Sequence, residues 1–288
     1  MSTPRKVTRR GFLRALSQVT LATAAFGVGA AGYSLKIEPR WLRVVSRTLR
    51  LPRLPAAFDG FRLAQISDLH FGRAVDPDYL IAACERTTAL KPDAIAVTGD
   101  FVSTLVDDQA DRVATAVSRL RAPLGVYATL GNHDWWNSAA IVRSAVTQGG
   151  ATLLTNTSLP LERGPARLHL AGVDDIWEAQ HDLSAALSAV PSGEAVVLLA
   201  HEPDYADTVA ADGRVDLMLS GHSHGGQVRL PVRGAPVLPA LGRKYPAGWY
   251  QIDGLQLYTN RGLGTSDLAV RFNCPPEITL FTLTSGAA

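Results

Sequence analysis

The chain has 288 residues, of which 47% are hydrophobic and 19% charged, as is usual for a globular protein of one large or two small domains. Its formal net charge is +2, but the first 14 residues hold five basic residues and no acidic one. The 28 basic residues less these five leave 23 against 26 acidic residues, a net charge of −3. Nucleic-acid binding by a broad positive surface is therefore not supported, and no nucleic-acid partner is expected.

Residues 1–35 are predicted to form an export segment. The sequence TRRGFLR at residues 8–14 precedes an uncharged run of apolar and small residues that reaches residue 33, with small residues suited to cleavage near Ala31. Paired arginines of this kind are typical of a signal for the twin-arginine translocase. The apolar run also suits a membrane anchor, whereas its Gly, Ala and Thr make a poor core helix. We expect an exported protein, periplasmic or associated with the cell envelope, with this segment cleaved or kept as an anchor.

Residues 36–288 are predicted to form one domain in which strands and helices alternate. Apolar runs bounded by polar turns predict buried strands at 61–66, 94–97, 125–130, 168–173, 195–199, 215–219 and 255–258, and helical spacing is found at 77–90, 106–120 and 138–147. This order favours an α/β domain whose sheet is covered on its faces. Shorter gaps with Gly and Pro in the later part predict hairpins there.

Two cysteines, Cys84 and Cys274, stand far apart and neither belongs to a CxxC motif, so a zinc ribbon and a disulfide framework are excluded. Whether the two pair with each other is left open by the sequence. We expect two buried thiols.

Five of the seven histidines come directly after predicted strands. Asp68 and His70 follow the run at 61–66, Asp100 follows 94–97, GNHD at 131–134 follows 125–130, His201 follows 195–199, and GHSH at 221–224 follows 215–219. Catalytic and ligand-binding groups gather at the carboxyl ends of strands in open α/β sheets. Because structural histidines would fall anywhere in the pattern, this distribution predicts a functional site.

The residue types at these strand ends indicate a centre with two metal ions. Strand alternation would put Asp68 and His70 on one side, and likewise His222 and His224. Carboxylate, imidazole and amide ligands suit Mn, Fe or Zn and do not suit calcium. With Asp100 shared, the ligands divide into two similar sets, as in enzymes that clamp a phosphoryl group between two ions. The glycines of SGHSHGGQ at 220–227 are expected to permit a tight loop against metal and substrate.

The motifs DxH, GD, GNHD, an isolated His and GHxH, in this order, resemble the calcineurin-like metallophosphoesterase superfamily. The similarity extends over nearly the whole chain after residue 36 and includes GWY at 248–250, NRGLG at 260–264 and PPEI at 275–278. Together with the paired arginines, it resembles the exported, cell-envelope phosphodiesterase branch. The resemblance implies an α-β-β-α sandwich of two mixed sheets flanked by helices.

The resemblance also implies a role for each motif residue. One ion would be held by Asp68, His70 and His224, and the other by Asn132, His201 and His222, with Asp100 bridging them. A hydroxide between the ions would attack phosphorus in line. His133 would protonate the leaving oxygen or stabilise its charge, and Asp134 would orient His133.

Substrate contacts are less strongly marked in the sequence. Trp135 and Trp136 directly follow GNHD, either as a wall of the substrate pocket or as packing. Arg261 lies in the glycine-containing NRGLG segment and is favoured as a phosphate contact over Arg243 and Lys244, which are expected to be exposed surface charges.

These features predict a two-metal phosphoester hydrolase acting outside the cytoplasm, preferring phosphodiesters, on a small phosphoester or phospholipid-like substrate. An alternative is a membrane-associated pyrophosphatase of a nucleotide-activated glycolipid of the UDP-diacylglucosamine type. An anchor and tryptophans in the pocket favour it, and export disfavours it, because such precursors are cytoplasmic. A catalytically silent metal-binding module on the same fold is a third interpretation, which the complete ligand set disfavours.

Overall fold

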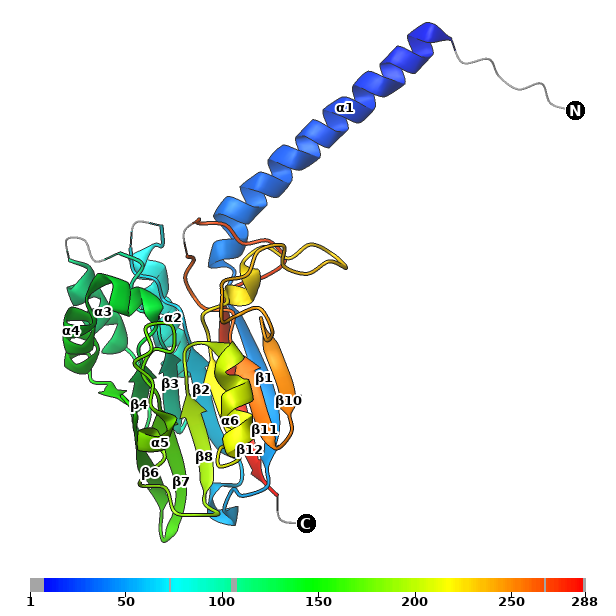
Figure 1. Cartoon of the computed structure of the whole chain (residues 1–288). Helices are drawn as coiled ribbons and strands as arrows, with labels where there is room; N and C mark the ends of the chain where they lie inside the picture. The colour runs from blue at the N-terminus through cyan, green and yellow to red at the C-terminus, as the bar shows by residue number, and fades with distance from the viewer. Residues whose placement is uncertain (1–7, 73, 105–107, 267, 287–288) are drawn as a thin grey trace, which may run out of the picture.

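The computed structural model describes residues 8–72, 74–104, 108–266 and 268–286. Two six-stranded sheets pack face to face, and helices cover the outer face of each (Figure 1). This arrangement confirms the predicted α-β-β-α sandwich of two mixed sheets.

The first sheet combines four parallel strands with two strands that run antiparallel to them. Its order is β1 (Arg43–Leu51), β12 (Glu277–Ser285), β2 (Phe61–Ile66), β3 (Ala94–Thr98), β4 (Val126–Thr129) and β5 (Thr152–Leu153). The strands β2 to β5 run parallel, whereas β12 is antiparallel to β2 and parallel to β1. The carboxyl ends of β2, β3 and β4 therefore meet at one edge.

The second sheet has a parallel centre with a hairpin at each side. Its order is β10 (Gly248–Ile252), β11 (Leu255–Thr259), β9 (Leu217–Ser220), β8 (Ala195–Leu199), β7 (Ala166–Gly172) and β6 (Thr157–Arg163). Hairpins join β6 to β7 and β10 to β11. The prediction of hairpins is wrong for β7, β8 and β9, which pair in parallel. Parallel pairing is possible because the segments between these strands, which contain α5 and α6, cross the outer face of the sheet.

Three helices pack on the first sheet and two short ones on the second. They are α2 (Pro77–Ala89), α3 (Gln109–Val117) and α4 (Asn132–Gln148), then α5 (Leu183–Ala186) and α6 (Ala206–Asp212). In α2 the side chain of Asp76 caps the first turn by accepting a hydrogen bond from the amide of Asp78. Its buried residues at 80, 83, 84 and 87 form the stripe expected of a helix on a sheet.

The apolar core has three parts, because each inner strand is buried on both faces. In β3, Ala94 and Ala96 face the other sheet, while Ile95 and Val97 face the helices. Cys84 and Cys274 are both buried free thiols, as predicted.

Several elements escaped prediction. The edge strand β1 is largely exposed and rich in arginine, and β6 contains Pro160, which only an edge strand tolerates. The helix predicted from residue 138 begins at Asn132 and is kinked at Ser138. Of the helix predicted at 106–120, residues 106 and 107 lie outside the described part.

The helix α1 (Arg9–Gly32) stands away from the sandwich (Figure 1). It continues into a π-helical turn at Tyr33–Ile37 and a 3-10 turn at Glu38–Arg40. Among the described residues, Phe12–Arg40 is the one segment whose length and apolar composition would allow it to cross a membrane, and its apolar window is not buried in the structure. Arg5 and Lys6 lie outside the described residues.

Candidate metal centre

The seven predicted metal ligands and His133 lie at the carboxyl ends of five strands, drawn from both sheets. Asp68 and His70 follow β2, Asp100 follows β3, Asn132 and His133 begin α4 after β4, His201 follows β8, and His222 and His224 follow β9. The sandwich thus brings residues of two sheets to one place.

Five of these residues adopt left-handed backbone conformations. The φ angles are 52° at Asp68 and at His70, 55° at Asp100, 68° at His222 and 51° at His224. The prediction that strand alternation puts these side chains on one side is therefore wrong. The side chains converge because the chain takes left-handed backbone conformations directly after β2, β3 and β9. Non-glycine residues in this region are costly and cluster at functional sites.

Close approach of the loops explains two glycines. A β-carbon at Gly221 would lie 1.9 Å from Oγ of Ser67, and one at Gly131 would lie 2.4 Å from Oδ1 of Asp100. Gly225 and Gly226 have φ angles of 61° and 79°, which confirms the expected tight loop.

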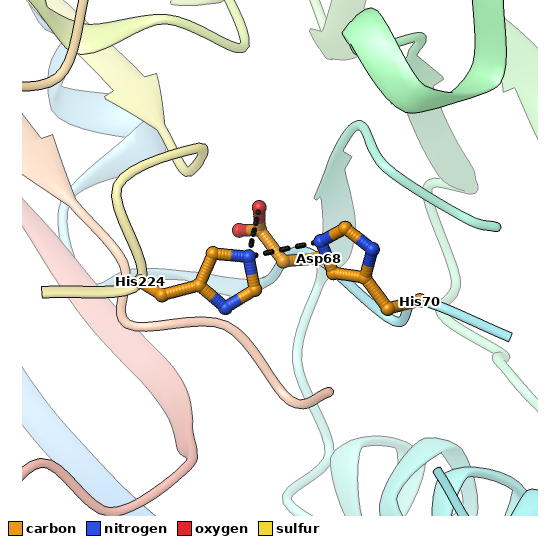
Figure 2. A group of neighbouring side chains, drawn as sticks. All are labelled: Asp68, His70 and His224. Atoms are coloured by element: carbon orange, nitrogen blue, oxygen red, sulfur yellow. Dashed lines mark hydrogen bonds and ion pairs between the residues drawn. The ribbon is translucent and has the colours of Figure 1, made fainter. Parts of the chain in front are cut away.

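One donor set consists of Asp68, His70 and His224, whose ligand atoms lie within 4.8 Å of one another. Figure 2 shows the three side chains turned toward a common point. Nε2 of His224 lies 2.9 Å from Nε2 of His70 and 3.3 Å from Oδ1 of Asp68. The other ring nitrogen of His70 contacts Oγ of Ser103 at 2.8 Å, which fixes the ring.

The second donor set consists of Asp100, His201 and His222, with Asn132 beside them. Nε2 of His201 lies 3.2 Å from Oδ2 of Asp100, and Nδ1 of His222 lies 3.0 Å from Oδ1 of Asn132. The other ring nitrogens contact backbone carbonyls, that of Thr98 for His201 at 2.6 Å and that of Ala240 for His222 at 2.7 Å. Such carbonyls orient imidazole ligands in metal sites.

Asp100, a member of the second set, also reaches the first. The same Oδ2 that contacts His201 is 3.5 Å from Nε2 of His70, and Oδ1 accepts a hydrogen bond from the amide of His133. This carboxylate is therefore within reach of both groups of nitrogen donors.

Burial gives the cluster the electrostatics of a cation site. It raises the pKa of Asp68 to about 7 and lowers that of His70 to about 3 and that of His222 to about 4. Burial also raises the pKa of Asp100, but the neighbouring His201 outweighs it and holds this pKa well below the ordinary value.

Two features of the ring nitrogens show that the residues fit a metal ion. Nε2 of His201 is buried, and no hydrogen bond to it is present among the described residues. Nε2 of His70 and Nε2 of His224 face each other at 2.9 Å, so two neutral rings would direct lone pairs at one point unless one of them donates a proton. A cation would accept lone pairs from all three nitrogens and offset the buried carboxylates.

His133 lies at the edge of the cluster, where it is half-buried. Its ring centre is 4.8 Å from that of His70 and 4.8 Å from that of Trp136. It borders a cavity of about 560 Å³ that is also lined by Asp100, Asn132, His222 and His224. The imidazole can therefore reach a molecule in the cavity.

Asp134 was predicted to orient His133, but its hydrogen-bond partners are backbone amides. Its carboxylate accepts hydrogen bonds from the amides of Gly131, Phe101 and Val102, at 3.0, 2.8 and 3.2 Å. Among the described residues, none of its hydrogen bonds goes to the imidazole of His133. Burial raises the pKa of Asp134 to about 8, and its backbone partners oppose the shift. Asp134 joins the loop after β3 to the start of α4.

Two predicted substrate contacts lie away from the cavity. Trp135 packs against the core under α4 and donates from its indole nitrogen to Asp174 at 3.0 Å. Arg261 is paired with the buried carboxylate of Glu277 at 2.5 Å and does not line the cavity. Trp136 lines the cavity instead, since residues one apart on a helix point in different directions.

Sequence reasoning missed Trp177 and Arg271. Trp177 lines the cavity beside His222, and no motif marks it. Arg271 is fully buried and donates to the carbonyls of Arg261 at 2.8 Å and Gly264 at 2.6 Å. The amide of Gly264 in turn donates to the carbonyl of Asp68 at 2.7 Å. Arg271 thus supports the loop that carries a predicted ligand, a role that no local pattern reveals.

A sandwich with imidazole and carboxylate donors at its strand ends defines a metal-binding α/β protein. The model of the calcineurin-like phosphoesterase family matches residues 61–226. The chain is 36% identical to the uncharacterized metallophosphoesterase YkuE of Bacillus subtilis, over 98% of this chain and 99% of that protein. It is 31% identical to the phosphodiesterase YaeI of Escherichia coli, over 96% of this chain and 99% of that protein. It is 28% identical to the UDP-2,3-diacylglucosamine pyrophosphatase LpxG of Chlamydia trachomatis, over 85% of this chain and 90% of that protein.

The chain therefore belongs to the calcineurin-like metallophosphoesterase family. It is a phosphoester hydrolase of a family that uses divalent metals, and its His and Asp side chains are clustered to bind them.

Proposed function

We propose that the chain is a phosphodiesterase with two metal ions, Mn, Fe or Zn, that acts outside the cytoplasm. The observation that carries the proposal is the position of Asp100, whose Oδ2 lies 3.5 Å from Nε2 of His70 and 3.2 Å from Nε2 of His201. One carboxylate that reaches two nitrogen sets suits a pair of ions better than a single ion.

Each donor set would hold one ion. Asp68, His70 and His224 would hold the first, Asn132, His201 and His222 the second, and Asp100 both. When bound, such ions polarise the phosphoryl oxygens and lower the pKa of water. Nε2 would be the ligand atom of His201 and Nδ1 that of His222, because the other nitrogen of each ring contacts a backbone carbonyl.

His133 would protonate the leaving oxygen or stabilise its charge. Its ring lies beside the cavity and next to His70, while its amide is held by Asp100 at 2.9 Å. An acid in this place assists departure of an alcohol from phosphorus, and general acids contribute about 10²- to 10⁴-fold to a rate. Asp134 would act through the backbone, by holding the turn after β3 against the first turn of α4.

Diester specificity is supported by the phosphodiesterase YaeI, which is similar over 96% of the chain. The cavity of about 560 Å³ leaves room for a second ester group beside the phosphate. The substrate would be a small phosphoester or a phospholipid-like molecule.

Export is supported by the N-terminal segment. Arg9, Arg10 and Arg14 lie at the start of α1, and the apolar part of the helix follows. Basic residues stay on the cytoplasmic side of a membrane segment, which puts the catalytic domain, residues 36–288, on the outer side. The twin-arginine translocase would carry out the export, and residues 1–35 would be its signal, cleaved or kept as an anchor.

A second candidate is a pyrophosphatase of a nucleotide-activated glycolipid, favoured by the similarity to LpxG and by two tryptophans in the cavity. Trp136 and Trp177 meet edge to face, with ring centres 5.5 Å apart, and would stack on a base or a lipid. The complete donor set still disfavours a silent binding module.

The test is metal-dependent hydrolysis of bis(p-nitrophenyl) phosphate beside p-nitrophenyl phosphate, after stripping and restoring Mn, Fe or Zn. We expect turnover of the diester that requires metal and falls by about 10²- to 10⁴-fold in His133→Ala, with metal content unchanged. His181→Ala is the control, because His181 packs edge to face against Tyr205 outside the centre. Preference for the monoester would overturn the diesterase assignment, and loss of metal in His133→Ala would overturn the division of roles.

A further inference from the structure

Exposed apolar side chains gather on the loops around the mouth of the cavity. Leu230 is 40% exposed, Val232 108%, Val237 76% and Leu268 69%. The segment that carries the first three projects beside the end of α1 (Figure 1). Grouped apolar side chains on exposed loops mark a surface that contacts another apolar phase.

The end of α1 is fixed to the catalytic body next to these loops. The carbonyl of Ser34 accepts a hydrogen bond from the amide of Arg271 at 3.0 Å. The buried carboxylate of Glu38 accepts from the amides of Asn273, at 2.9 Å, and Cys274. The direction in which α1 leaves the body is therefore determined by hydrogen bonds to residues 271–274.

The same segment pairs with the loop that carries Leu230 and Val232. Val228 and Phe272 form a parallel bridge. The amide of Arg229 donates to the carbonyl of Phe272 at 2.8 Å, and the amide of Phe272 donates to the carbonyl of Gln227 at 2.9 Å. The loop with Leu230 and Val232 is therefore tied to the same segment that holds the end of α1.

The cavity is polar at the donor cluster and apolar toward the loops. Its apolar wall consists of Val228, Val237, Leu238, Pro239, Leu268 and Val270. Two of these residues, Val237 and Leu268, also belong to the exposed group. The cavity thus extends from the donor cluster to the apolar loops.

We propose that α1 is retained as an anchor, that Leu230, Val232, Val237 and Leu268 rest in the surface of the bilayer it crosses, and that the cavity takes the alkyl chain of a phosphodiester amphiphile from that bilayer. At about 1.5 Å per residue, α1 is about 36 Å long, enough for a hydrocarbon layer of about 30 Å. The exposed Lys36 and Arg233 add attraction to anionic lipid headgroups.

This inference rests on the proposed phosphodiesterase activity for its chemical step. Water adds across one P–O bond, so that the products are a phosphomonoester and an alcohol, and the departing oxygen receives the proton. The alkyl chain provides binding energy, because each buried methylene contributes about 0.8 kcal/mol, so that two of them raise affinity by about tenfold.

Contact with the bilayer is tested by fluorescence, independently of enzymatic activity. Val232→Cys and Ile141→Cys, the latter an exposed apolar position on α4, receive an environment-sensitive nitrobenzoxadiazole label, since Cys84 and Cys274 are buried. The full chain is reconstituted into vesicles of phosphatidylethanolamine and phosphatidylglycerol. We expect blue-shifted emission and quenching by nitroxide lipids at position 232 but not at 141. Equal emission and quenching at the two positions would overturn the docking.

Recognition of the alkyl chain is tested by competition. Hexadecylphosphocholine and glycerophosphocholine are both phosphocholine diesters, and only the first carries a long chain. We expect the first to inhibit hydrolysis of bis(p-nitrophenyl) phosphate at a concentration at least about 100-fold lower. Equal inhibition would overturn the amphiphile and favour a soluble diester.

A double variant separates docking from catalysis. Leu230→Asp with Val232→Asp should abolish the signal of a label at position 268 (Leu268→Cys) in vesicles, and should change hydrolysis of the soluble diester by less than about twofold. Neither residue lines the cavity. An undiminished label signal would contradict the docking surface. If the wild-type chain does not hydrolyse the soluble diester, the proposed function fails, while the label still reports on docking.

Discussion

Replacing Gly221 with alanine tests whether the loop after β9 holds Asp68 in position. A β-carbon at residue 221 would lie 1.9 Å from Oγ of Ser67 and 2.3 Å from Oδ2 of Asp68. The amide of His222 donates to both oxygens of the same carboxylate, at 3.0 and 3.2 Å. Gly221→Ala therefore pushes directly on a predicted ligand.

The magnitude follows from this geometry. Real β-carbons keep at least 3.0 Å from such atoms, so the loops must part by about 1 Å. Ser67 and Asp68 are fully buried, so their side chains cannot turn into solvent. Overpacking of this kind costs about 1–3 kcal/mol of unfolding free energy, and a 1 Å displacement at a reacting centre lowers turnover by about 100-fold.

The assay combines metal content, hydrolysis of bis(p-nitrophenyl) phosphate and thermal unfolding. Gly254→Ala is the matched control, because the turn between β10 and β11 has nothing within 4 Å of a β-carbon there. We expect Gly221→Ala to lose metal and activity, and Gly254→Ala to keep both. Full metal content and activity within about twofold of the control would refute the argument that this contact positions Asp68.

Three further substitutions test the centre. Asp100→Asn should deplete both ions, measured by elemental analysis, because its carboxylate lies beside both donor sets; full retention would contradict the bridge. Asp134→Ala should lower the free energy of unfolding in urea by about 1–3 kcal/mol, since three backbone amides lose their acceptor, and an unchanged midpoint would refute that role. Trp136→Ala should lower kcat/KM for the diester by about tenfold, whereas Trp135→Phe should leave it near the wild-type value; the reverse result would favour the sequence-based assignment of Trp135.

The elements that the sequence predicted are those with strong local patterns. The inner strands β2, β3, β8 and β9 are buried on both faces, so their apolar runs stand out. The edge strands β1 and β6 escaped, because half-exposed strands with Arg or Pro have no such run.

The site divides in the same way. Motif order and residue types predicted the eight side chains that gather at the strand ends, because carboxylates and imidazoles after buried strands have few structural uses. They misplaced Asp134, Trp135 and Arg261. Asp134 bonds to backbone amides of a turn, Trp135 bonds to the carboxylate of Asp174, and Arg261 pairs with the buried Glu277. Nothing near these residues in the sequence reports those partners.

By itself, the sequence determined which chemical groups the protein carries and at which end of its strands they lie. Only the tertiary structure decided which atoms meet, because the decisive contacts join distant segments, as in the pairing of Asp68 with His222 across 154 positions. It also decided that the end of α1, the loop at Leu230 and the mouth of the cavity share one face of the molecule. The periodicity of apolar residues in a segment indicates which of its faces is buried, whereas the packing between segments depends on the whole fold.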